Sequence, residues 1–332
     1  MNFISVKENS DIPKYKQIVQ SVEKALTDHI LKKGDRLPSI NSIRNKNSIS
    51  RDTVMQAFNE LKNRGIVQSV AGKGYYIKSE NINIQKKVFL LFDELNAFKE
   101  DLYKSFLNNL DKNIEVDIYF HHFNPDVFDK LILESIGNYS KYIIMPANLK
   151  RTNMVIDKLP EDKVIILDQF HPELSKYAVI YQNFEKIIYD ALQKEVKLLK
   201  KYQKFVFVFS ELKQPQELLV GFKKFCEEFN MEYDIISTME DRDISNREVY
   251  LIPDDRNLIR IIKKMKEKDY RLIDNIGIIS YNESLLKEIV EGGITTISTD
   301  FKYMGKQLAR MLFEKEKSKI ENPGKVILRN SI

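Results

Sequence analysis

The sequence has few of the residues on which several classes of protein depend. One cysteine, Cys226, among 332 residues excludes an intrachain disulfide framework and a zinc ribbon built from cysteines. No run approaches the roughly twenty consecutive apolar residues of a transmembrane helix, so no membrane partner is expected. The first ten residues include Lys7 and Glu8 and lack the apolar core of a secretory signal. We therefore expect a cytoplasmic globular protein.

Catalytic motifs are equally scarce. The chain has four histidines and no HExxH motif, no His/Cys cluster and no Gly-x-Ser-x-Gly elbow. Gly72-Lys73-Gly74 is not a phosphate-binding P-loop, because the GxxxxGK[ST] spacing and the helix behind it are missing. Asp254 and Asp255 are adjacent and diverge in direction, which favours a helix cap or a strand-end ligand over a metal or acid/base pair. We expect no enzyme activity, no metal and no cofactor.

Positive charge is concentrated at the N-terminus. The first 80 residues contain 14 Lys and Arg against 8 Asp and Glu, a net charge of +6, while the remainder contains 39 against 40. Such asymmetry indicates a small part that meets a polyanion, such as nucleic acid, and a larger part with another task. The length also predicts two or three domains.

The N-terminal pattern predicts three helices followed by a hairpin. Ser39 and Ser50 are placed to cap the second and third helices, and Gly34 is expected to end the first. The first helix has an apolar stripe at three- and four-residue steps, formed by Tyr15, Ile18, Val19, Val22, Leu26 and Ile30. The third has a buried side formed by Val54, Ala57, Phe58 and Leu61. Strands at 66–70 and 75–78 then form a β-wing.

The predicted third helix can lie across a DNA major groove with its first residues facing bases and phosphates. Arg51 can grip a phosphate or a guanine edge, while Ser50 and Thr53 can donate to phosphate oxygens. At the wing tip, Gly72 lets the backbone approach a second surface and Lys73 supplies charge. A tight hairpin without DNA contacts is the alternative for the wing tip.

Five segments of this region carry a recognisable spacing. They are PKYKQI at 13–18, GDRLPS at 34–39, SRDTV at 50–54, AFNEL at 57–61 and GKGY at 72–75. Nearly all of residues 13–78 thus resembles the winged helix-turn-helix of GntR-type bacterial transcription regulators. The resemblance implies that six residues contact operator DNA: Ser39, Ser50, Arg51, Thr53, Gly72 and Lys73. Asn41 stands where the family commonly has arginine, and Arg44 and Lys46 close by are our further candidates.

From Val88 onward, short apolar runs alternate with amphipathic stretches. The runs predict strands at 88–92, 114–120, 142–145, 164–167, 205–209, 233–236, 249–252 and 276–279. Repeated β-α units favour an α/β fold with parallel sheets covered on both faces, and about 245 residues of them favour two lobes. The polar stretch 79–87 is the expected linker between a DNA-binding domain, 1–78, and a two-lobed domain, 88–332, for effector binding and dimerisation.

Short motifs follow one another along this second region. They are Leu95-Asn96-Ala97-Phe98, Gln182-Asn183-Phe184-Glu185, Asp254-Asp255, Ser280-Tyr281-Asn282-Glu283 and Gly293-Ile294-Thr295-Thr296-Ile297. Their order resembles the periplasmic-sugar-binding-protein fold used by LacI-type repressors. The resemblance implies that six residues face the cleft between the lobes: Asn96, Phe98, Asn148, Asn183, Asp255 and Asn282. Each could instead cap a helix or fill a core.

Those residue types suit a sugar, because an aromatic face covers the C–H side of a pyranose while amides and carboxylates bond its hydroxyls. Leu218 stands where many sugar-binding members have arginine, which disfavours an acidic substituent. The leading hypothesis is a homodimeric transcriptional regulator, a repressor of a carbohydrate-use operon. It would bind near-palindromic operator DNA and respond to a neutral monosaccharide.

Two other hypotheses stay open. A carbohydrate-active enzyme, such as a sugar kinase fused to a DNA-binding module, would need a phosphate loop and a catalytic base. A signalling or protein-interaction module without a small ligand would have an empty or apolar cleft. Whether the sugar releases or recruits DNA is also open.

Overall fold

The computed structural model describes residues 3–63, 66–79, 86–111, 114–136, 138–314 and 317–332. The chain divides into two units: the N-terminal 88 residues with residues 112–116 and 132–140, and the rest. Most of the expected linker, residues 80–85, lies outside the described residues, and strand β3 already begins at Lys86. No helix in the described part of the chain is both long and apolar enough to cross a membrane.

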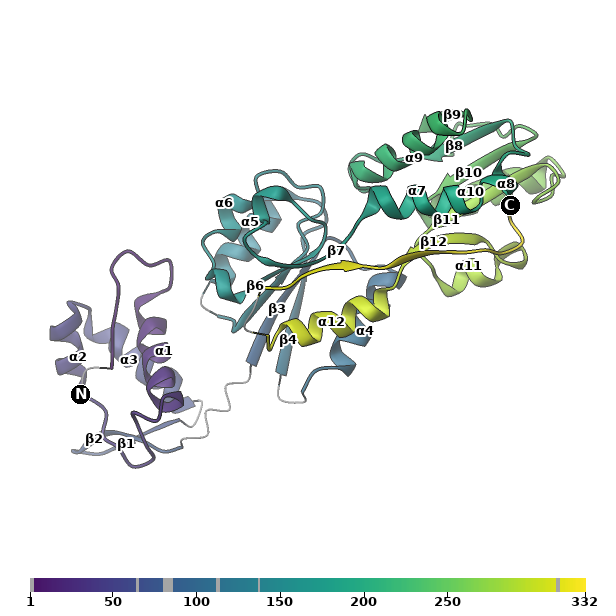
Figure 1. Ribbon diagram of the computed structural model, residues 1–332. Coiled ribbons are helices and arrows are strands. Elements are labelled where there is room, and N and C mark those ends of the chain that lie inside the picture. Colours follow the sequence, from purple (N-terminus) through teal and green to yellow (C-terminus); the bar gives the residue numbers. More distant parts are fainter. Residues whose placement is uncertain (1–2, 64–65, 80–85, 112–113, 137, 315–316) are drawn as a thin grey trace. The chain divides into compact units, whose positions relative to one another are not determined.

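The N-terminal region has the three helices and the wing that the sequence predicts (Figure 1). The elements are α1 (Lys14–Thr27), α2 (Ile40–Asn47), α3 (Arg51–Asn63), β1 (Val67–Val70) and β2 (Gly74–Ile77). The two strands pair antiparallel. All four residues expected on the inner side of α3 have 0% exposure, so its apolar stripe forms the centre of this core.

The end of α1 differs from the sequence prediction. The helix stops at Thr27, because His29 adopts φ 55°, and Ile30 is left 48% exposed. Gly34 serves the wing instead: its N–H donates to the Ile77 carbonyl in a backbone with φ 94°, which glycine adopts without strain. The apolar period in the sequence therefore extends past the turn at which the helix ends.

From Lys86 onward the chain forms two six-stranded sheets, each with its own helices (Figure 1). The first has the order β13-β7-β6-β5-β3-β4, and its strands are β3 (Lys86–Phe92), β4 (Ile114–Phe120), β5 (Lys141–Ile144), β6 (Val164–Asp168), β7 (Ala178–Gln182) and β13 (Lys319–Asn322). The second has the order β14-β12-β11-β10-β8-β9, and its strands are β8 (Lys204–Val208), β9 (Glu232–Ile236), β10 (Glu248–Ile252), β11 (Ile276–Tyr281), β12 (Thr295–Thr299) and β14 (Gly324–Ile327). We call these halves the first and second lobes.

Parallel pairing dominates, as the β-α pattern predicts. The pairs from β5 to β7 and from β8 to β12 are parallel, and β14 runs antiparallel to β12. Strands β6, β10, β11 and β12 are buried along their whole length, because helices cover both faces of such sheets. The eight predicted strands are all present, whereas β7, β12, β13 and β14 were not predicted as strands.

Helices of both lobes pack closely at glycines. The first lobe has α4 (Ala97–Asn108), α5 (Pro125–Ser135), α6 (Asn153–Ile156) and α12 (Phe301–Met311); the second has α7 (Phe184–Lys194), α8 (Val196–Leu199), α9 (Gln216–Glu228), α10 (Asp255–Glu267) and α11 (Leu285–Ile289). Helix α12 lies beside α4 (Figure 1). A Cβ at Gly305 would lie 2.4 Å from the Leu102 carbonyl oxygen, so only glycine permits this approach.

The chain passes between the lobes three times, from β7 to α7, from β12 to α12 and from β13 to β14. Each lobe is therefore built from separate stretches of sequence. Cys226, in α9, has 0% exposure, and burial raises the pKa of its thiol to about 12, in agreement with an inert core thiol.

Candidate nucleic-acid interface and ligand cavity

Two serines begin the helices that would meet DNA. The Ser39 hydroxyl accepts a hydrogen bond from the Ser42 N–H at 3.1 Å and caps α2. The Ser50 hydroxyl accepts from the Thr53 N–H at 3.1 Å and lies 2.8 Å from the Thr53 hydroxyl. Both N-caps were predicted, and both leave helix N-termini of the kind that attract phosphate at the surface.

Three of the positively charged candidates for DNA binding lie on the two helices that these serines cap. Arg51 is the first residue of α3, and Arg44 and Lys46 lie in the last turn of α2; all three are exposed. At the wing tip, Gly72 has φ 72°, no atom of a described residue beyond its two chain neighbours lies within 4 Å of where its Cβ would be, and Lys73 beside it is exposed. Of the eight candidates from the sequence, seven are exposed and Thr53 is half-buried, so each can reach the surface of this unit.

The larger unit contains a cavity of about 260 Å³. Residues at the carboxyl ends of strands in both sheets line it. They include Asp168 at the end of β6, Gln182 at the end of β7, Tyr281 at the end of β11 and Asn282 directly after it. Ligands of open parallel α/β sheets bind at this edge. The volume is close to the lower end of the range for ligand pockets, about 300–1,000 Å³, so a small ligand fits best.

Four of the six predicted ligand residues line this cavity: Asn96, Phe98, Asp255 and Asn282. The Asn96 side chain caps α4 by accepting from the Lys99 N–H, and the Phe98 ring stacks on Phe301 with 4.8 Å between centroids. Asn282 has φ 62°, and its Oδ1 is buried without a hydrogen-bond partner among the described residues. An unpaired buried acceptor is costly, which makes this atom a candidate for a ligand contact.

Asn148 and Asn183 do not line the cavity. The Asn148 Nδ2 donates to the carbonyls of Glu211 at 3.2 Å and Gln214 at 2.7 Å, and so ties the first lobe to a loop of the second. Asn183 caps α7, and its Nδ2 donates to the Glu321 carboxylate at 3.3 Å. The structure brings neither side chain into this cavity, because the Nδ2 group of each is engaged by other parts of the protein.

Several lining residues were missed by sequence reasoning. Lys99, 5% exposed, forms a short ion pair with Asp93, and the Gln182 Nε2 donates to the Asp168 carboxylate at 2.5 Å. Lys287, 3% exposed, donates from Nζ to the carbonyls of Tyr281 and Asn282. The sequence does carry a signal for the two acids, because Asp93 directly follows the buried apolar strand β3 and Asp168 ends the buried apolar strand β6. No pattern marks a buried lysine.

The positive charges in the cavity wall are compensated. Each lining lysine has a carboxylate partner: Asp93 for Lys99, Glu94 for Lys213 at 2.9 Å, and Asp255 for Lys287 at 3.4 Å. Burial raises the pKa of Asp168 to about 6, opposed by the positive charge of Lys99 and the hydrogen bond from Gln182. Burial likewise lowers the pKa of Lys287, opposed by Asp255. The wall therefore offers no unpaired lysine to an acidic ligand.

Metal binding has no support in the described part of the chain, where no group of three His, Cys, Asp or Glu side chains could hold an ion. Asp254, considered from the sequence as half of an acid pair, caps α10 by accepting from the Asn257 N–H at 2.9 Å. Its role as a helix cap is confirmed.

The solved structures compared here each match about three quarters of this chain. A LacI family transcriptional regulator from Silicibacter pomeroyi gives a TM-score of 0.62 at 13% identity, covering 74% of this chain and 98% of that one. A LacI family transcriptional regulator from Enterococcus faecium, solved with bound ribose, gives 0.59 at 16% identity over 74% and 98%. At these identities the likeness establishes the fold, a LacI-type periplasmic-binding-protein-like architecture, as the motif order predicted.

Sequence comparison concerns the N-terminal part. Residues 14–77 match the family described as bacterial regulatory proteins, gntR family. The HTH-type transcriptional repressor YtrA of Bacillus subtilis is 33% identical over 99 residues, which are 30% of this chain and 72% of that protein. The mannosyl-D-glycerate transport/metabolism system repressor MngR of Escherichia coli is 34% identical over 82 residues, 25% of this chain and 34% of that protein. The chain therefore belongs to the GntR family of bacterial transcription regulators, with a LacI-like two-lobed domain behind its winged helix-turn-helix.

Proposed function

We propose that this transcriptional regulator is a homodimeric repressor of a carbohydrate-use operon, controlled by a neutral monosaccharide in the cavity. Its operator is near-palindromic, because a dimer of helix-turn-helix units reads two half-sites. The observation that carries the proposal is the cavity itself: a small space at the strand ends of two sheets, in which each lining lysine is paired and Asn282 Oδ1 has no hydrogen-bond partner in the described part of the chain.

The chemistry of the wall favours a neutral polyol. Asn282 Oδ1 and the Asp168 carboxylate are acceptors, which suit the hydroxyl donors of a sugar, and the half-buried ring of Phe98 can cover a C–H face. An anionic effector would instead need a cation, and Lys99, Lys213 and Lys287 are each paired with a carboxylate. Leu218, which is buried in the wall and stands where many sugar-binding members of the resembled family have arginine, supplies no charge either.

Two relatives support the carbohydrate assignment by their names. MngR is a repressor of mannosyl-D-glycerate transport and metabolism, and the Enterococcus faecium regulator holds ribose. YtrA and MngR are both repressors, which supports repression as the mode of action. The relatives and solved structures named above are all transcription regulators, so a regulator without catalysis is preferred to a sugar kinase.

The proposal that the effector is a neutral sugar is tested by measuring the binding of a panel of neutral monosaccharides, among them D-ribose and D-glucose, by thermal shift and calorimetry. A sugar that binds should stabilise the protein by about 2.7 kcal/mol at a hundredfold excess over Kd. Asn282→Ala should weaken that binding by about 1–3 kcal/mol, because a sugar hydroxyl loses its acceptor, and Phe98→Ala should weaken it through lost apolar contact.

Asn183→Ala is the matched control, because it removes an amide at the edge of the second lobe that does not line the cavity. Its sugar affinity should equal that of the wild type. If Asn282→Ala and Phe98→Ala also bind with wild-type affinity, the sugar does not occupy this cavity. A panel in which only acidic compounds bind would contradict the neutral effector.

If α3 binds the operator as proposed, Arg51→Ala should lose operator affinity. The substitution should cost about 1–3 kcal/mol if the guanidinium reads a base edge, as measured by fluorescence anisotropy at fixed salt. Lys62→Ala is the control, because Lys62 lies in the last turn of α3, about 16 Å along the helix from Arg51. Equal affinity of the Arg51 variant and the control would rule out α3 as the recognition helix.

A further inference from the structure

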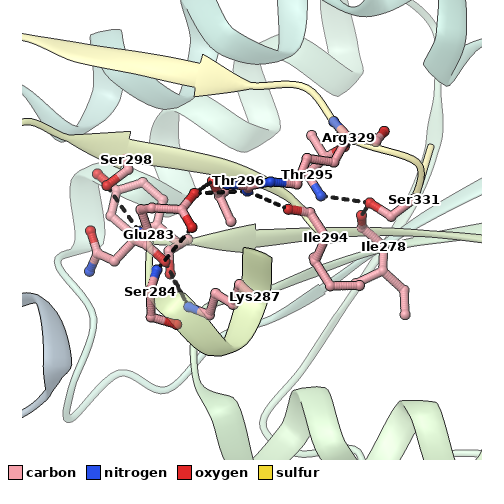
Figure 2. A network of polar contacts seen from close by, with 12 residues as sticks. Ile278, Glu283, Ser284, Lys287, Ile294, Thr295, Thr296, Ser298, Arg329 and Ser331 are labelled. Atoms are coloured by element: carbon pink, nitrogen blue, oxygen red, sulfur yellow. Dashed lines mark hydrogen bonds and ion pairs between the residues drawn. The ribbon is translucent and has the colours of Figure 1, made fainter. Parts of the chain in front are cut away.

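Arg329, which follows β14, reaches a loop that borders the cavity (Figure 2). Its Nη1 donates to the Glu283 Oε2 at 2.9 Å and to the Ile294 carbonyl at 2.9 Å. The same Glu283 oxygen accepts a short hydrogen bond from the Thr296 hydroxyl. Glu283 is the direct neighbour of Asn282, the cavity residue whose Oδ1 has no hydrogen-bond partner among the residues that the structure describes.

The loop from Asn282 to Ser284 is held on its backbone as well. The Asn282 N–H donates to the Ile297 carbonyl at 2.8 Å, and the Asn282 carbonyl accepts from Lys287 Nζ at 2.7 Å. The Glu283 N–H donates to the Ser298 hydroxyl at 3.0 Å. With φ 62°, Asn282 occupies the left-handed region, which is unfavourable for most residues and persists where surrounding contacts enforce it.

Arg329 is itself fixed by its surroundings. Its N–H donates to the Thr295 hydroxyl at 3.0 Å, and the buried Ser331 hydroxyl bridges the Thr295 N–H and the Ile278 carbonyl (Figure 2). A Cβ at Gly293 would lie 2.7 Å from the Arg329 Cδ, so the arginine stem crosses a position that only glycine leaves open. The segment after β14 is thus anchored to both β11 and β12.

We propose that Arg329 is a positioning residue of the effector site. It does not line the cavity; through Glu283 it holds Asn282 in the left-handed conformation that presents Oδ1 to a ligand hydroxyl. This inference rests on the proposed function, because it assigns Asn282 to the effector. It adds a residue nearly fifty positions away in the sequence to the determinants of effector affinity.

The test compares Arg329→Met with Arg329→Lys in the full-length protein. Hydrogen exchange by mass spectrometry, without sugar, should show the amides of Asn282 and Glu283 exchanging at least about tenfold faster in Arg329→Met, since one hydrogen-bonded ion pair is lost. Arg329→Lys keeps a charge for Glu283 and should restore most of the protection. D-ribose is then the calorimetric probe, and its affinity should fall at least about tenfold in Arg329→Met and recover in Arg329→Lys.

Arg242→Met separates positioning from general destabilisation. Arg242 pairs with Asp234 and Glu248 in the same lobe, and none of the three lines the cavity. This variant should be destabilised without faster exchange in the Asn282 loop. Unchanged loop exchange in Arg329→Met, or equal loop exchange in Arg242→Met, overturns the inference. If wild-type protein fails to bind ribose, that result counts against ribose as the effector, and the exchange comparison still decides the role of Arg329.

Discussion

Replacing Lys99 by methionine is expected to lower the free energy of unfolding of the larger unit by about 3–5 kcal/mol. The Lys99 ammonium and the Asp93 carboxylate form an ion pair whose side chains are 6% and 9% exposed. Methionine keeps the apolar stem of Lys99 but removes its charge, so a buried carboxylate loses its counter-ion. The cost of such an orphaned charge exceeds that of most single substitutions.

Urea unfolding followed by circular dichroism measures this loss, because the chain contains no tryptophan for fluorescence. Lys104→Met on the same helix is the control: Lys104 and Glu100 form an exposed i,i+4 pair, for which less than about 1 kcal/mol is expected. Adding Asp93→Leu to Lys99→Met should recover much of the stability. If Lys99→Met lowers the free energy of unfolding no more than the control does, the Lys99–Asp93 pair contributes little to stability.

Stability should also fall as the pH rises through the range in which Asp168 ionises. Burial raises the pKa of this carboxyl from 3.8 to about 6, so the folded state holds the proton more tightly than the unfolded state. The contribution is fully present below pH 3.8 and is lost as the pH rises through about 6. The shift corresponds to about 3 kcal/mol between the two protonation states.

Asp168→Asn isolates this contribution, because asparagine resembles the protonated acid and does not titrate. The difference in unfolding free energy between wild type and variant should change by about 3 kcal/mol between pH 3.5 and 7, in favour of the variant at high pH. The groups near Asp168 include Lys99, Asp93 and Gln182, and all are retained in both proteins. A difference that stays constant with pH would mean that Asp168 ionises as it would in water.

The winged helix-turn-helix could be predicted well because its signals are local. Ser39 and Ser50 cap helices through residues three positions ahead, and the buried side of α3 repeats within four turns. The error at Gly34 arose because its partner, the Ile77 carbonyl, lies 43 residues away in the wing. Sequence periodicity carries no information about such a bond.

The contrast between local and distant partners also explains why the ligand residues could be predicted only in part. An asparagine after a strand can cap a helix, grip a loop or face a ligand, and the choice depends on distant neighbours. Asn148 is engaged by carbonyls at Glu211 and Gln214, more than sixty residues away, whereas no described group satisfies Asn282 Oδ1. Strands β13 and β14 were missed because both lie at sheet edges, where most of their residues are exposed or half-buried. Their sequences, KIEN and GKVI, therefore contain no long apolar run.

The order in which the strands appear along the chain has a consequence for synthesis on the ribosome. The last strand of the winged helix-turn-helix ends at Ile77, so this module has all its elements early, and domains generally fold as units from the N-terminus. Both sheets of the larger unit, in contrast, wait for β13 and β14, which end at Asn322 and Ile327. A nascent chain therefore acquires its DNA-reading module well before the fold that encloses the cavity is complete.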